Sequence, residues 1–134
     1  MNMKLRAPIA AAMFALVAGC GSASPAARPR PSTNAKLLIL SPTPNQVTGP
    51  NLTLQFQVTG GTVLPPAQAT GPLRGDQGHI HVSVDGKLVQ MAYSTHADLN
   101  GLSPGPHSVS ASWVATDHLP FTNRVVADVL FTVQ

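Results

Sequence analysis

Several residue types are scarce in this chain of 134 residues, and each shortage argues against a type of bond or a class of enzyme. There is one cysteine, Cys20, so the chain cannot form an internal disulfide bond and must be stabilised by packing. There is no glutamate, and the aspartates stand mostly in turn-forming segments, so the paired carboxylates of a glycosidase are hard to assemble. The sequence also lacks a Gly-x-Ser-x-Gly motif and a glycine-rich loop followed by a helix pattern. We therefore expect a protein that is not an enzyme.

Charged residues are few as well, and two of them stand at the amino terminus. Lys4 and Arg6 precede an uncharged, mostly apolar run from Ala7 to Ala18. That run is shorter than the roughly 20 apolar residues of a transmembrane helix, so the pattern predicts a signal peptide over residues 1–19. Its removal leaves six basic against five acidic side chains and no basic cluster. Nucleic acid is therefore not an expected partner.

The apolar run ends in Leu16-Val17-Ala18-Gly19-Cys20. This segment resembles the lipobox of bacterial lipoproteins, in which small residues precede a cysteine. The resemblance implies cleavage before Cys20 and a diacylglycerol on its sulfur. Each buried CH₂ group contributes about 0.8 kcal/mol, so two acyl chains hold a protein firmly on a membrane. We expect a lipid-anchored, extracytoplasmic protein of the cell membrane or outer membrane; the alternative is a secreted protein with an A-x-A-like cleavage site and a free thiol.

The segment that follows Cys20 is rich in Ser, Pro, Ala and Arg and lacks large apolar residues as far as Asn34. This composition is typical of an extended linker, so residues 20–35 are predicted to be a flexible, disordered tether. Residues 36–134 remain, which suits one small domain with one core and is too short for two.

Within residues 36–134, valine-rich runs of alternating apolar and polar residues recur between glycine and proline breaks. No uninterrupted segment is long enough for a substantial helix, so the pattern predicts an all-β domain. Asp85-Gly86 is typical of a tight hairpin turn. The expected strands cover residues 37–40, 52–58, 79–84, 87–92, 107–115 and 125–133. Their spacing favours a single antiparallel immunoglobulin-like β-sandwich over a barrel.

Two turn segments, Ser41–Val47 with Gly49 and Leu102–His107, resemble those of bacterial immunoglobulin-like modules. The second is a Pro-Gly-x-His corner. Together with Gly78-His79-Ile80-His81 and Asp117–Pro120, it resembles a group of short exported bacterial domains of uncharacterised function. The resemblance implies an exported domain in which metal binding is worth testing, and it implies no established activity.

The five histidines all lie in the predicted domain, and two of them share a strand. Because side chains alternate along a strand, His79 and His81 lie on one face while Ile80, Val82 and Val84 lie on the other. The apolar face is expected to pack on the core, so both histidines are expected to point outward. Their Cα atoms are about 6–7 Å apart at a rise of about 3.3 Å per residue, close enough to chelate one ion.

A metal site needs a further ligand, and the sequence leaves several candidates open. They are His118 in a loop, Asp128 on the outward side of the last strand, and His96 in the segment Ser94–Asp98. Imidazole and carboxylate suit zinc or copper(II), and the thioether of Met91 would suit copper(I). The alternative is that these are solvated surface histidines that bind no metal.

Two further residues are expected to be structural. His107 and Trp113 lie on the core-facing side of the strand predicted over residues 107–115. His107 stands at the corner where immunoglobulin-like folds use a tyrosine to bond the backbone. Trp113 is expected in the core.

Two functions follow from these patterns. The first is a non-catalytic, membrane-anchored binding module for a transition metal, copper or zinc, with His79, His81, His118 and Asp128 as its ligands. The second is a structural or protein-interaction module that contacts another cell-envelope protein without a metal, with the Gly60–Gly78 loop as a contact.

Overall fold

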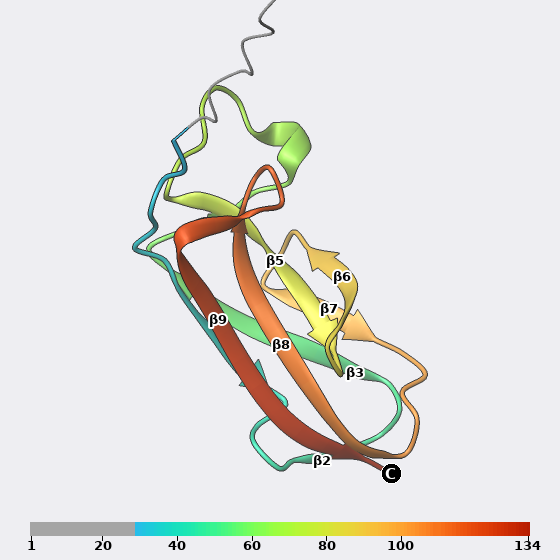
Figure 1. The fold of residues 1–134 in the computed structure, drawn as a ribbon. Helices are drawn as coiled ribbons and strands as arrows, with labels where there is room; N and C mark the ends of the chain where they lie inside the picture. Colours follow the sequence, from blue (N-terminus) through green and yellow to red (C-terminus); the bar gives the residue numbers. More distant parts are fainter. Residues whose placement is uncertain (1–28) are drawn as a thin grey trace, which may run out of the picture.

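A computed structural model describes residues 29–134 (Figure 1). The predicted signal peptide, residues 1–19, and the predicted lipidation site Cys20 lie outside the described residues. Within residues 29–134 no helix is long and apolar enough to cross a membrane. The elements are β1 (Lys36–Ser41), β2 (Val47–Thr48), β3 (Leu52–Thr59), β4 (Thr62–Val63), a 3₁₀ helix (Pro66–Gln68), β5 (Gln77–Val84), β6 (Lys87–Ala92), β7 (His96–Leu99), β8 (Gly105–Ala115) and β9 (Pro120–Val133).

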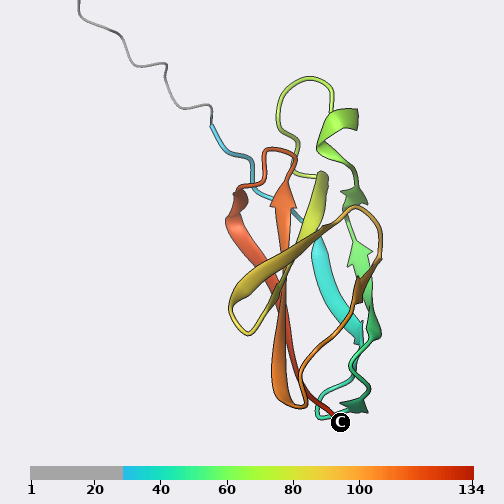
Figure 2. The same cartoon turned by 90° about the vertical axis from the view of Figure 1, so that its right-hand side faces the viewer.

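The strands form two sheets that face each other (Figures 1 and 2). The smaller sheet has the order β1-β3-β7. The larger sheet has the order β2-β9-β8-β5-β4, and β6 also pairs with β5. The long pairs are antiparallel, whereas the two-residue strands β2 and β4 pair in parallel with β9 and β5. The prediction of an all-β sandwich is confirmed.

The core lies between the sheets because alternate apolar side chains of the long strands face inward. Ile80 and Val82 of β5 are fully buried, as the alternation predicts, and Trp113 of β8 is 1% exposed. The other large buried side chains include Leu54, Phe56, Val109, Phe121, Phe131 and Val133. The face of β5 that carries His79 and His81 is therefore the outer face of the larger sheet.

The six expected strands are present, most of them a few residues longer than the pattern indicates. Asp85 and Gly86 form the expected turn between β5 and β6, and both have a positive φ, 51° and 80°, which a type I′ hairpin requires. Strand β7 is not among the expected strands. It is short, and only Ala97 and Leu99 turn inward from it, against β3.

The prediction that a flexible tether extends to residue 35 is wrong for its last residues. The Arg30 guanidinium pairs with Asp117 (Nη1–Oδ2 2.7 Å) and donates to the carbonyl oxygens of Leu119 and Pro120. The backbone amide of Thr33 donates to the Asn123 side chain at 2.8 Å. These acceptors belong to the β8–β9 turn and the start of β9, 87 to 90 residues away, so the composition of the segment itself does not reveal them.

Candidate metal centre

Strand β5 places two imidazoles on the outer face of the larger sheet. His79 is paired with Val114 of β8, and His81 lies between Ser112 of β8 and Met91 of β6. Ile80 and Val82 pack inward from the same strand, so the core holds β5 in a register that turns both histidines outward.

The third imidazole comes from the turn between β8 and β9. His118 has a φ of 66°, a left-handed conformation that costs a non-glycine residue about 1–2 kcal/mol. Its amide donates to the Ala115 carbonyl at 2.9 Å, and Arg30 binds the residues on either side of it, Asp117 and Leu119. The turn is thus held in a strained conformation that directs the His118 ring toward β5.

The three rings converge on one point. The Nε2 atom of His79 lies 3.1 Å from Nε2 of His81 and 3.0 Å from Nδ1 of His118. One ligand nitrogen of each ring lies within 4.8 Å of the others. In a tetrahedral zinc site with bonds of about 2.0–2.1 Å, neighbouring nitrogens are about 3.3 Å apart, so the two contacts of His79 are within a few tenths of an ångström of that spacing. This cluster can hold a metal ion.

His79 lies on the outer face of β5, but the expectation that it is exposed is wrong: it is 0% exposed. The Tyr93 ring covers it at a centroid distance of 5.1 Å, and the His118 ring covers it at 4.7 Å. Both covering residues come from connecting segments, so the alternation within β5 cannot reveal them. His81 is half-buried and His118 is exposed.

The three rings cannot satisfy all their close contacts by hydrogen bonds among themselves. A neutral imidazole has one N–H and one lone pair. Nε2 of His79 carries either one proton or one lone pair, so it can form a good hydrogen bond with only one of the two ring nitrogens that it faces, and the other contact is left without one. Nδ1 of His79 is buried without a partner in the described part of the chain. A metal ion would accept all three lone pairs at once.

The electrostatics keep the buried rings neutral. Burial, and after it the charges on His81 and His118, lowers the pKa of His79 to about 4. Burial, followed by the charge on His118, also lowers the pKa of His81. Both rings are therefore neutral at neutral pH, and a neutral ring has the lone pair that binds a metal.

The structure does not bring the other candidate ligands into this cluster. Asp128 is exposed on β9, where it pairs with Ser110, and β8 lies between it and β5. His96 is exposed on β7, in the other sheet. Met91, by contrast, is the direct cross-strand neighbour of His81, and its sulfur accepts a hydrogen bond from the Tyr93 hydroxyl at 3.7 Å. A thioether therefore lies beside His81, one of the three imidazoles.

His107 lies apart from the cluster at the start of β8. Its Nε2 donates to the Ser103 carbonyl oxygen and its Nδ1 to the Asp85 carboxylate, both at 2.7 Å. Two acceptors require two N–H groups, so this ring is protonated. Accordingly its pKa is raised, first by the Ser103 carbonyl and then by Asp85. His107 ties the corner before β8 to the β5–β6 turn.

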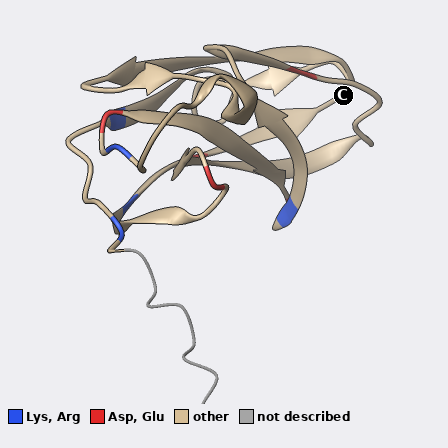
Figure 3. Ribbon diagram, turned by 90° about the horizontal axis from the view of Figure 1, so that it is seen from above, with Lys and Arg blue, Asp and Glu red and all other residues tan. Residues whose placement is uncertain are grey.

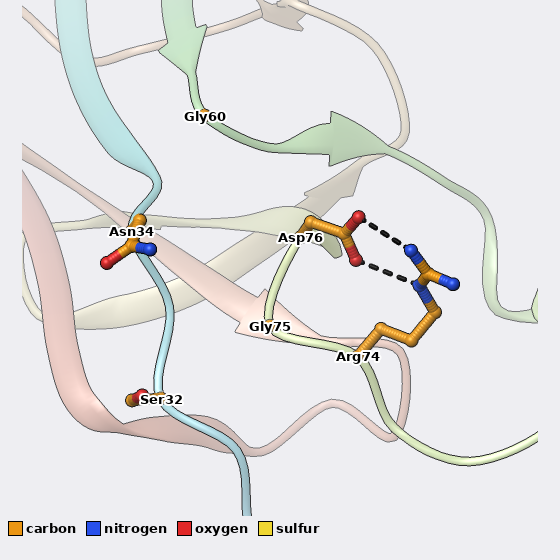
Figure 4. Close-up of a pocket in the computed structure, with 6 residues that line it drawn as sticks. All are labelled: Ser32, Asn34, Gly60, Arg74, Gly75 and Asp76. Carbon is orange, nitrogen blue, oxygen red and sulfur yellow. Dashed lines mark hydrogen bonds and ion pairs between the residues drawn. The ribbon is translucent and has the colours of Figure 1, made fainter.

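Two hollows on the domain surface are candidate ligand sites. One, of about 410 Å³, lies near the start of the domain, and its charged side chains Arg74 and Asp76 bind each other at 2.8 Å (Figure 4). The other, a groove of about 240 Å³, is lined by His81 and His118 together with Ser112, Arg124 and Val126. Only the second of these hollows adjoins the three-histidine cluster.

Comparisons with known proteins support the fold. A fibronectin type III-like module of Clostridium thermocellum CbhA superposes with a TM-score of 0.51 at 15% identity, over 72% of this chain and 93% of that one. The domain has an immunoglobulin-like fold of the fibronectin type III kind. Two other solved structures are less similar. A Jonesia denitrificans lytic polysaccharide monooxygenase has a TM-score of 0.46 at 19% identity, over 69% of this chain and 60% of that one. The PKD domain of human KIAA0319 has a TM-score of 0.45 at 14% identity, over 83% of this chain and 90% of that one. No protein-family model and no curated protein matches the sequence.

Proposed function

We propose that this chain is a membrane-anchored, extracytoplasmic lipoprotein whose domain binds one copper or zinc ion and catalyses no reaction. The observation that carries the proposal is the convergence of His79, His81 and His118, with ring nitrogens 3.0 and 3.1 Å from the central Nε2. Without an ion, a strained turn and a buried ring nitrogen with no hydrogen-bond partner in residues 29–134 both cost free energy.

The donor set indicates which ions fit. Three imidazoles suit zinc and copper(II), whereas magnesium and calcium prefer oxygen ligands, which this cluster does not offer. The thioether of Met91 beside His81 adds a donor that copper(I) accepts and zinc does not favour. Copper(I) would therefore take Met91 as a fourth donor, whereas zinc and copper(II) would leave the fourth position open.

The location is proposed from the amino-terminal sequence. The lipobox-like Leu16–Cys20 follows a short apolar run, and a diacylated cysteine would hold the domain at a membrane surface. Arg30, which binds Asp117 of the β8–β9 turn, follows Cys20 by ten residues.

The alternative, an interaction module without a metal, is favoured by one observation. The edge strand β1 exposes Leu38 and Leu40 on its outer side, about half accessible each. An apolar edge strand is a surface onto which another protein chain can pair.

Metal titration decides between the two. The purified full chain in mild detergent is expected to bind one zinc or copper ion by calorimetry and by metal analysis after dialysis. His118→Ala is expected to weaken binding at least about tenfold, because it removes one of three ligands. His96→Ala is the matched control, since His96 lies in the other sheet, and its affinity should equal that of the wild type. Equal affinity in all three proteins would contradict the proposal.

The lipid anchor is tested separately. Expression of the full chain in a bacterium should give a membrane-bound product whose amino-terminal peptide begins at Cys20 with a diacylglycerol mass added. Cys20→Ser should abolish both the lipid and the processing. A soluble product with an unmodified thiol would disprove the anchor and leave the metal site untouched.

A further inference from the structure

The groove beside the cluster lies on the outer face of the larger sheet. His81 and His118 line it, together with Leu88 of β6, Ser112 of β8 and Arg124 of β9. Its volume of about 240 Å³ corresponds to roughly eight water molecules at about 30 Å³ each. It therefore suits a small molecule of a few heavy atoms at the cluster.

The groove has a positively charged side chain and no carboxylate in its lining. Three neutral imidazoles would leave a bound divalent ion with its full charge. The nearby Asp117 is already paired with Arg30 at 2.7 Å. Arg124 lines the groove and forms no ion pair with any residue of the range 29–134. Charged residues are otherwise sparse and scattered along the ribbon of this domain (Figure 3).

The cluster also leaves a coordination position free. His79 is buried beneath the other two rings, so an ion held by all three nitrogens would face the groove through His81 and His118. Zinc bound by three protein ligands keeps a fourth position for water or another small ligand.

We propose that this groove binds a small carboxylate anion, with one oxygen on the metal ion and the carboxylate paired to Arg124. The inference rests on the proposed metal binding. A carboxylate matches both partners, because its oxygens are ligands for zinc and copper(II) and its planar shape accepts two parallel hydrogen bonds from a guanidinium group.

The test uses the full chain in detergent, loaded with cobalt(II), whose visible absorption reports its ligands. Acetate is added at constant ionic strength, with acetamide as the neutral molecule of the same shape. Acetate should change the absorption saturably, and acetamide should not. Arg124→Gln should weaken acetate binding about ten- to a hundredfold while leaving cobalt affinity unchanged. Arg74→Gln, which removes an arginine of the other hollow, should behave like the wild type.

The outcomes separate the two proposals. A wild-type chain that takes up no cobalt, zinc or copper overturns both the proposed function and this inference. Normal metal uptake with no response to acetate overturns the anion site alone. Equal acetate affinity in Arg124→Gln and the wild type shows that the metal takes any anion unaided, which also overturns the role of the groove.

Discussion

Replacing His79 with leucine is expected to reduce zinc or copper affinity more than about a hundredfold, the largest loss of any single substitution in the cluster. The Nε2 atom of His79 is the nitrogen that contacts both of the other rings, so its removal leaves two ligands without their common neighbour. Leucine has a similar volume and no polar atom, so it fills the fully buried site without leaving an unpaired donor.

The matched control is His96→Leu, which makes the same chemical change at an exposed histidine of the other sheet. Circular dichroism and urea unfolding of the metal-free proteins show whether the fold is retained, and calorimetry measures the affinity. Retention of wild-type affinity in a folded His79→Leu protein would show that the ion, if bound, lies elsewhere.

The same variant should change how stability depends on pH. The folded-state pKa of His79, about 4, lies below its unfolded value of about 6.5. As the pH falls from 6.5 to 4, the unfolded chain takes up a proton that the folded chain excludes. The free energy of unfolding of the metal-free protein should therefore fall by up to about 3 kcal/mol over this range, and its full value should be present above pH 6.5.

His79→Leu should remove most of that fall, and the remainder is expected from His81, whose pKa is also lowered. The contribution of His107 has the opposite sign, because its raised pKa gives stability that is lost as the pH rises, and it is common to both proteins. Urea unfolding at pH 4.5 and 7.5 measures the difference. An identical pH dependence in both proteins would mean that His79 is not a buried neutral ring.

Gly78→Ala is expected to cause a large loss of stability from a single added methyl group, about 3 kcal/mol. A Cβ at this position would overlap the carbonyl oxygen of Val114 and lie 2.9 Å from two atoms of the Trp113 indole. One of these neighbours is backbone in a paired strand and the other is a core side chain that is 1% exposed, so neither can move freely. The strand must shift or the sheet must open.

Gly49→Ala is the control, because nothing lies within 4 Å of the added Cβ there and the residue has an ordinary φ. Its free energy of unfolding should equal or slightly exceed that of the wild type, since alanine restricts the unfolded chain. Equal stability of the two variants would contradict the close approach of Trp113 to β5.

The alternation of apolar and polar residues predicted much of the architecture. The strands at Leu52, His79 and Val125 were predicted because apolar side chains recur at every second position, and a strand with that pattern must bury one face. The Asp85-Gly86 turn was predicted because that dipeptide readily takes a positive φ at both positions. The same rule placed His79 and His81 together on one face.

The sequence by itself thus determined the fold class and the pair of histidines, because both depend on periodicity along one strand. It could not choose His118 over Asp128 or His96, since that choice depends on where the β8–β9 turn lies in space, and Arg30 holds that turn from 87 residues away. Nor could it show that His79 is buried, because its cover, Tyr93 and His118, comes from other segments. Only tertiary packing brings these groups together, and it adds His118 to the pair and excludes water from His79, which the strand pattern alone would leave exposed.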